Sequence, residues 1–122
     1  MFEPNAIVLY VDDLELSSSF YQDLLKIKPV EASSSFHSFP LSNGMSLALK
    51  AMHTAIPAAY NKDGVELAFT VENTTQVDEL FAEWQMKGIK MAQPPMSLPY
   101  GYTFLALDRD SHRLRVVSLR AS

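Results

Sequence analysis

The two halves of this 122-residue chain repeat one pattern of apolar residues, and this repeat limits the folds that the chain can adopt. In each half, a run of β-branched and aromatic residues is followed by apolar residues at helical spacing. Four pairs match at an offset of about 60 residues: Leu9 with Phe69, Val11 with Val71, Phe20 with Leu80, and Leu24 with Trp84. We therefore expect two similar modules, at about residues 1–52 and 62–122, within a single domain (1–122).

The first module is predicted to contain a strand, a helix and three further strands. The run AIVLYV at 6–11 is typical of a strand, and helical spacing begins after Asp12, which together with Glu15 fits a capping box. Pro29 is expected to close the helical segment. The remaining strands are predicted at 27–32, 35–41 and 45–50, with Asn43 and Gly44 supplying positive φ angles in the last turn.

The second module follows the same order. Residues 65–71 are predicted to form a strand, and the next helix has two candidate N-terminal caps: Asn73 with Gln76, or Thr75 with Asp78. Gly88 is expected to end this helix. The segment AQPPMSLPYG is interpreted as a Pro-rich connection before a closing hairpin at 102–117. These elements define an α+β fold built from two βαβββ modules.

Alternation along the strands separates two faces of the predicted sheet. One face is uniformly apolar and should pack against the helices: Ile7, Leu9, Val11, Leu67, Phe69 and Val71. The other face is mixed: Ala6, Val8, Tyr10, Ser46, Ala48, Lys50, Glu66, Ala68, Thr70, Arg113, Arg115 and Val117. We expect a curved mixed sheet with helices on its convex side and a ligand cup on the mixed side. A face that is simply solvated is the alternative.

Composition narrows the function classes. The net charge of −4 and the pI near 5.2 argue against nucleic acid or an anionic membrane as a partner, because both require clustered Lys and Arg. The sequence contains no long apolar stretch and does not begin like a signal peptide, so we expect a cytoplasmic protein. Because the chain has no cysteine, disulfides, thiolate metal sites and cysteine nucleophiles are excluded.

The chain resembles the vicinal oxygen chelate superfamily, which includes glyoxalase I, the bleomycin resistance proteins and the extradiol dioxygenases. The duplication itself carries the resemblance, together with four segments: VLYVDDLELSSSFYQDLL at 8–25, NGMSLAL at 43–49, VELAFTVEN at 65–73, and LPYGYTFLALDRDSHRLRVV at 98–117. The resemblance implies an eight-stranded cup, usually completed by a second chain in a homodimer. It also implies that a ligand or a metal binds on the concave side of the cup.

Family enzymes hold a divalent metal at four positions, which in this chain carry Ala6, Ala48, Glu66 and Arg115. Only Glu66 could ligate a metal, because a methyl group has no lone pair and a guanidinium stays protonated and repels a cation. One carboxylate is too few for Mg²⁺ or Zn²⁺. We therefore expect no metal, no cofactor and no catalytic residue.

The residues that replace the metal ligands suggest an ion pair between Glu66 and Arg115. Such a pair is either a structural substitute for the metal or an anchor for a polar group of a ligand. The three histidines share no ligand spacing and are expected to be exposed or structurally satisfied: His37, His53 and His112. The serines at 17–19 and 33–35 have no acid-base partner at a useful spacing and are expected to face solvent.

Metal-free members of the superfamily, such as the bleomycin resistance proteins, sequester a drug with aromatic side chains. We predict the following ligand-binding residues: Tyr10, Phe36, Ala48, Lys50, Glu66, Tyr102, Phe104 and Arg115. Tyr60 and Tyr100 are further aromatic residues near the expected mouth of the cup. The alternative for Phe36, Tyr102 and Phe104 is that each fills the core or a dimer interface. Trp84 belongs to the apolar helix stripe and is assigned to the core.

The preferred interpretation is metal-independent binding or sequestration of a small aromatic or cationic molecule by a bleomycin-resistance-like protein. The alternative is a metal-dependent lyase, isomerase or dioxygenase of the same superfamily, with a relocated metal site formed by Glu66 and a histidine from the central loop or from a partner chain. A third interpretation is a protein-interaction dimer with a vestigial cup. A histidine pair beside Glu66 would favour the enzyme, whereas a solvent-filled cup would weaken the third interpretation.

Overall fold

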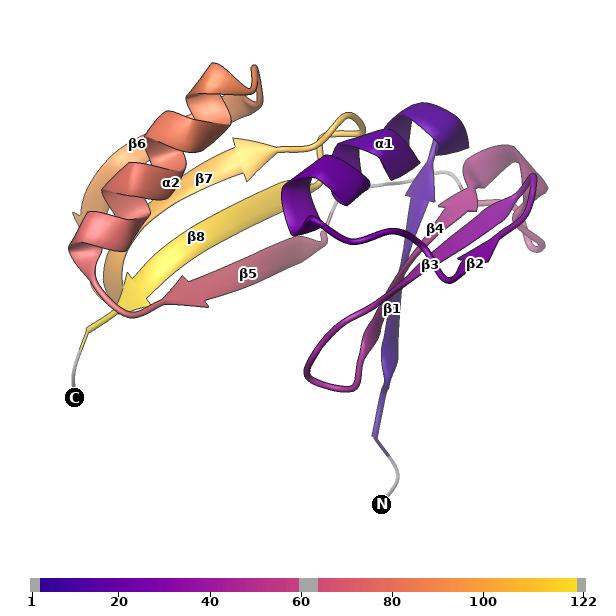
Figure 1. Ribbon diagram of the computed structural model, residues 1–122, viewed down its shortest axis with the longest axis horizontal. Coiled ribbons are helices and arrows are strands. Elements are labelled where there is room, and N and C mark those ends of the chain that lie inside the picture. The colour runs from indigo at the N-terminus through magenta and orange to yellow at the C-terminus, as the bar shows by residue number, and fades with distance from the viewer. Residues whose placement is uncertain (1–2, 60–63, 121–122) are drawn as a thin grey trace. The chain divides into compact units, whose positions relative to one another are not determined.

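The computed structural model describes residues 3–59 and 64–120 and contains two compact units, Met1–Lys62 and Asp63–Ser122. Each unit has one helix packed on one four-stranded mixed sheet, in the order strand, helix and three strands (Figure 1). The predicted α+β class and the two βαβββ modules are confirmed. Tyr60, which we expected near the mouth of the cup, lies outside the described residues.

The elements of the first unit are β1 (Ala6–Val11), α1 (Leu14–Leu25), β2 (Glu31–Ala32), β3 (Phe36–Pro40), β4 (Ser46–Ala51) and the 3-10 helix η1 (Met52–Thr54). The strand order is β1-β4-β3-β2, with β1 parallel to β4 and the other pairs antiparallel. The turn before β4 uses a positive φ at Gly44 alone, while the Asn43 side chain accepts a hydrogen bond from the backbone N–H of Met45.

The second unit repeats this topology with β5 (Glu66–Val71), α2 (Thr74–Met86), β6 (Lys90–Leu98), β7 (Gly101–Leu107) and β8 (Arg113–Leu119). The strand order is β5-β8-β7-β6, and β5 is again parallel to the last strand. The parallel pairing of first and last strands leaves the first strand of each unit at the edge of its sheet.

The start of α1 differs from the predicted cap by one residue. Asp13, not Asp12, is extended and accepts a hydrogen bond from the backbone N–H of Leu16. Because the third helical residue is then Leu16, Glu15 cannot complete a capping box. In α2 the prediction based on Asn73 and Gln76 is confirmed, since each side chain bonds the other residue's backbone N–H.

The Pro-rich segment before the closing hairpin is a strand, so its interpretation as a connection is wrong. β6 pairs with β7 at the edge of the sheet, and its register shifts between Met91 and Gln93 and again between Gln93 and Met96. Pro94 and Pro95 lie within the second irregularity. Proline is tolerated there because an edge strand with bulges does not need every N–H for pairing.

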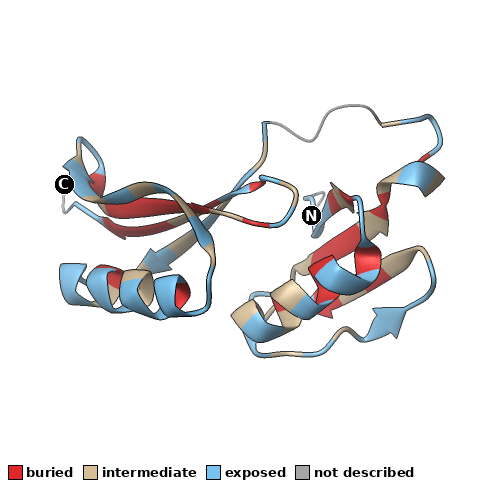
Figure 2. Ribbon diagram, turned by 90° about the horizontal axis from the view of Figure 1, so that it is seen from above, coloured by how far each residue is buried: buried red, intermediate tan, exposed pale blue. Residues whose placement is uncertain are grey.

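The core of each unit lies between its helix and one face of its sheet (Figure 2). Fully buried side chains include Leu9, Tyr21, Phe39 and Leu49 in the first unit and Val77, Phe104, Leu114 and Val116 in the second. Ile7 was expected to pack against a helix, but it is 37% exposed because α1 lies near the other end of β1 (Figure 1). Trp84 is buried on α2, as predicted.

Candidate functional site

The side of each sheet that its own helix leaves uncovered is called here the open face. On the open face of the first unit, the backbone register places Tyr10 beside Lys50 and Lys50 beside Phe36, in one row across β1, β4 and β3. All three side chains are half-buried. Ala48 lies one step along β4 on the same face and is 2% exposed. Four of the predicted ligand-binding residues therefore share this face.

A polar cluster occupies the open face of the second unit, and Arg115 on β8 is its centre. Arg115 Nε donates to Glu66 Oε2 on β5 at 3.0 Å, which confirms the predicted ion pair. Arg115 Nη1 donates to Thr103 Oγ1 on β7 at 3.0 Å and to Gln93 Oε1 on β6 at 3.5 Å. One guanidinium thus joins all four strands of the sheet.

Tyr100 borders this cluster from the turn between β6 and β7. Its ring centroid lies 5.8 Å from Arg115 Cζ, within the range of a cation–π contact. Tyr100 is 44% exposed, so part of its ring faces solvent beside the guanidinium. Here the name Arg115 cluster is used for Arg115, Glu66, Thr103, Gln93 and Tyr100.

Sequence reasoning missed Thr103 and Gln93. Gln93 lies in the segment that we interpreted as a loop, and a loop has no faces to assign. Thr103 was overlooked because the register of β7 was not worked out, although Thr103 stands opposite Val117, which the alternation had placed on the open face. If the faces assigned to β8 had been extended to the paired residues of β7, Thr103 would have been identified.

Phe104, which we predicted as a ligand-binding residue of the cup, lies on the helix side of the sheet. Its side chain is 0% exposed and makes edge-to-face contacts with Phe81 and Trp84 on α2, at centroid distances of 5.3 Å and 5.4 Å. Phe104 pairs with Val116 on β8, which is also buried on the helix side. The alternative assignment of Phe104 to the core therefore describes its position.

Tyr102, another predicted ligand-binding residue of the cup, also lies on the helix side. Its hydroxyl donates a hydrogen bond to Asp78 Oδ1 on α2 at 2.8 Å. The pKa of Tyr102 is raised above its ordinary value of 10.0, chiefly by this hydrogen bond, with smaller contributions from desolvation and from the charge of Asp78.

The raised pKa of Tyr102 predicts a stability change at alkaline pH. The folded protein holds the phenol proton more tightly than the unfolded chain, so the contribution is complete below pH 10 and is lost as the pH rises through the folded pKa. We expect Tyr102→Phe to be less sensitive to alkali over this range than the unaltered protein. Denaturant titrations at several alkaline pH values test this, and identical pH dependence would contradict it.

Two of the histidines are held by polar contacts inside their units, and the third is exposed. His37 Nδ1 lies 2.7 Å from Ser18 Oγ on α1, and its Nε2 lies 3.7 Å from Glu15 Oε1. Ser18 is only 1% exposed, so this trio cannot present a nucleophile to a substrate, and the expectation that Ser18 faces solvent is wrong. His53 is exposed on η1.

His112 and Asp108 form a buried pair in the turn between β7 and β8. Asp108 Oδ2 lies 2.7 Å from His112 Nδ1, and Asp108 Oδ1 accepts hydrogen bonds from the backbone N–H groups of Asp110 and His112. The side chains of His112 and Asp108 are each 2% exposed. The prediction that the histidines are exposed or structurally satisfied is confirmed.

The same turn contains the one group of at least three potential metal-ligating side chains within residues 3–59 and 64–120: Asp108, Asp110 and His112. Their ligand atoms lie within 4.8 Å of one another. However, the oxygens of Asp108 already bond the turn's backbone and His112, as a structural Asx turn requires. Within the described part of the second unit, Glu66 belongs to no such group.

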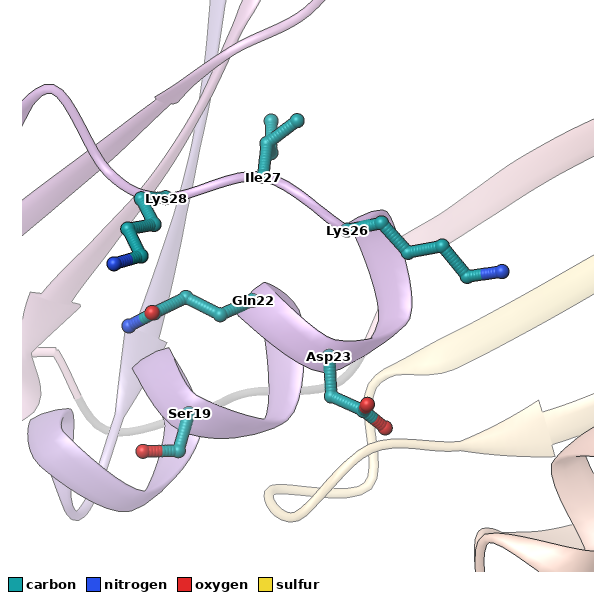
Figure 3. Close-up of a pocket in the computed structure, with 6 residues that line it drawn as sticks. All are labelled: Ser19, Gln22, Asp23, Lys26, Ile27 and Lys28. Atoms are coloured by element: carbon teal, nitrogen blue, oxygen red, sulfur yellow. The ribbon is translucent and has the colours of Figure 1, made fainter.

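A surface pocket of about 510 Å³ lies at the C-terminal end of α1 (Figure 3). Its lining consists of Ser19, Gln22, Asp23, Lys26, Ile27 and Lys28. Figure 3 shows the Lys26 side chain pointing away from those of Ser19 and Gln22. The pocket includes none of the predicted ligand-binding residues, and its polar groups do not converge on one point, as a specific site requires.

The chain belongs to the glyoxalase/bleomycin resistance protein/dioxygenase superfamily, whose family model matches residues 4–116. It is 30% identical over 119 residues to the phenazine antibiotic resistance protein EhpR of Enterobacter agglomerans, covering 95% of this chain and 92% of that protein.

Two solved structures show how far the fold is shared. The solution structure of protein ATC0852 from Agrobacterium tumefaciens is 48% identical and has a TM-score of 0.92, with 99% of this chain and 100% of that chain covered. A glyoxalase-related enzyme from Fulvimarina pelagi is 22% identical and has a TM-score of 0.83, with 97% and 88% covered. Within the described ranges, no helix is long and apolar enough to cross a membrane.

Proposed function

We propose that this protein binds and sequesters a small planar aromatic molecule without a metal, in the manner of an antibiotic resistance protein. The observation that carries the proposal is the composition of the open faces. At the positions where the resemblance implies a metal, Arg115 is bonded to the one carboxylate, that of Glu66. On the open face of the other sheet, the aromatic residues Tyr10 and Phe36 flank Lys50. Aromatic side chains with a few polar groups are typical of sites for flat organic ligands.

The similarity to a phenazine antibiotic resistance protein supports the aromatic class of ligand. Phenazine is a planar tricyclic compound, and its size suits stacking on tyrosine and phenylalanine rings. The charges on the two open faces, each taken by itself, favour a neutral or anionic ligand over a cation, because Lys50 lies on the open face of the first unit and Glu66 on that of the second unit is already paired with Arg115. Of the two ligand classes expected from the sequence, the aromatic class has the better support.

The assembly and the location of the protein are further parts of this proposal. We expect a homodimer, because the family resemblance implies that a second chain completes the cup. We also expect the protein to act in the cytoplasm, where a sequestering protein would lower the free concentration of a toxic compound. Size-exclusion chromatography with light scattering tests the first expectation.

A direct test is titration of the purified protein with phenazine in the presence of EDTA, followed by isothermal calorimetry and by the fluorescence of Trp84, the single tryptophan. We expect saturable binding with the same Kd with and without EDTA, and phenazine recovered unchanged by chromatography. A ligand that binds only the folded state also raises the melting temperature. Absence of binding, or binding that EDTA abolishes, would contradict the proposal.

The residue-level prediction concerns Tyr10. We expect Tyr10→Ala to weaken phenazine binding by about tenfold or less, because an aromatic pair contributes about 0.5–1.5 kcal/mol beyond its buried area. Tyr102→Ala is the matched control, since it removes the same ring from the helix side of the other sheet. Equal losses in the two variants would mean that Tyr10 does not contact the ligand. Circular dichroism verifies that both variants are folded.

A further inference from the structure

We infer that Arg115 is the specificity anchor of this binding site, and that it selects planar aromatic ligands carrying an acidic oxygen substituent, such as an aryl carboxylate. This inference rests on the proposed function, because it names the ligand class of the same site. It also decides between the two roles that the sequence left open for the Glu66–Arg115 pair, a structural substitute for a metal and a ligand anchor.

The hydrogen bonds of Arg115 leave part of its guanidinium unused. A guanidinium carries N–H donors on Nε, Nη1 and Nη2. Nε donates to Glu66, and Nη1 donates to Thr103 and, at a longer distance, to Gln93. Within the described part of the chain, Nη2 has no hydrogen-bond partner. Its two N–H groups are available to a ligand.

Nη2 is also accessible to solvent. Within the described residues, no buried side-chain nitrogen or oxygen lacks a hydrogen-bond partner. Since Nη2 lacks one, it cannot be among the buried atoms. The Arg115 side chain as a whole is only 11% exposed, so this access is confined to a small part of the side chain. A charged group that is mostly buried, and accessible only in part, interacts more strongly with an anion than a fully solvated group does.

The guanidinium is held in one orientation before any ligand arrives. Glu66 and Thr103 fix it at Nε and Nη1, and two contacts define the plane of the group. The Thr103 hydroxyl is itself oriented, because it donates to the backbone carbonyl of Val116 at 2.7 Å and is 0% exposed. Preorganisation of this kind lowers the entropic cost of binding.

The surroundings of Nη2 favour an aromatic ligand over a simple anion. The partly exposed ring of Tyr100 lies beside the guanidinium, so a flat ligand can contact the ring while its oxygen accepts from Nη2. Glu66 neutralises part of the charge on Arg115, which weakens the attraction for small anions that make no aromatic contact. The aromatic contact and the hydrogen bond together favour an aromatic carboxylate or phenolate as the ligand.

The test compares phenazine with phenazine-1-carboxylate by isothermal calorimetry at neutral pH. We expect the unaltered protein to bind the carboxylate on the order of tenfold to a hundredfold more tightly, the range of a hydrogen bond to a charged group. Arg115→Gln should abolish this preference, so that the two compounds bind the variant with affinities within about threefold of each other. Arg113→Gln is the matched control, since it removes the same charge from the same strand and face, and it should retain the preference.

A second variant is expected to increase the affinity for the carboxylate ligand, a result that misfolding cannot produce. Glu66→Gln keeps a hydrogen-bond acceptor for Arg115 Nε but removes the competing negative charge. We expect the affinity for phenazine-1-carboxylate to rise by about fivefold relative to the affinity for phenazine.

The outcomes separate the two proposals. Equal affinity of the unaltered protein for the two compounds would overturn the role of Arg115 and leave the proposed function standing. A preference that survives Arg115→Gln, or that is lost equally in Arg113→Gln, would overturn it as well. If neither compound binds, the proposed function fails, and the inference fails with it.

Discussion

Replacing Gly101 by alanine is expected to destabilise the second unit by about 3 kcal/mol or more. A Cβ atom at this position would lie 2.2 Å from the carbonyl oxygen of Ser118 and 3.0 Å from Leu119 Cα. Both are backbone atoms of β8, and the φ of Gly101 is +157°. The clash cannot be relieved by rotating a side chain, because β7 and β8 pair at this point, with Gly101 opposite Leu119.

Urea unfolding followed by Trp84 fluorescence measures this effect, because Trp84 lies in α2 of the same unit. Gly88→Ala is the matched control: Gly88 also has a positive φ, +78°, but no atom lies within 4 Å of the position that an alanine Cβ would occupy there. It should lose only about 1–2 kcal/mol, the cost of a left-handed conformation for an L-residue. If the two variants lose equal stability, the close approach of β8 to Gly101 is not a constraint in solution.

The duplicated architecture was predictable because the information that specifies it is local and occurs twice. The strand and helix patterns around Leu9 and Phe69 match, and each helix begins at a recognisable cap, as Asn73 with Gln76 shows. Errors of one residue, as at Asp13, arise because two adjacent carboxylates can each fill the cap position.

β6 could not be predicted because its local sequence contradicts its structure. Pro94 and Pro95 disfavour a strand in any local assignment, and only the free edge beside β7 makes pairing possible there. This omission also removed Gln93 from the candidate site. The tertiary position of a strand at the edge of its sheet thus outweighed its propensity.

The face on which a side chain lies could be predicted only for strands in which apolar and polar residues alternate. The pairing of Glu66 with Arg115 was predicted from the family resemblance, because both residues stand at positions that hold metal ligands in family enzymes. In β7 nearly every residue is apolar, so alternation could not distinguish the faces, and the helix-side positions of Tyr102 and Phe104 were not predicted. The burial of a residue on a uniformly apolar strand depends on the helix that covers it.

Phe104→Ala is expected to cost about 3–5 kcal/mol, because it leaves a cavity at the centre of the second unit. Phe104 is 0% exposed and contacts both Phe81 and Trp84. The free energy of unfolding of a small domain is about 5–15 kcal/mol, so this loss is a large fraction of the total. Urea unfolding monitored by circular dichroism measures it, since the substitution changes the surroundings of Trp84 directly.

Phe104→Leu separates a role in the core from a role in ligand binding. Leucine fills most of the space and should cost roughly 1–2 kcal/mol, so the protein remains folded at room temperature. If Phe104 acts only in the core, the folded variant binds phenazine with unchanged Kd, because the ring packs against α2 on the side away from the Arg115 cluster. A clear loss of affinity with little loss of stability would return Phe104 to the ligand site and contradict the assignment of β7 faces.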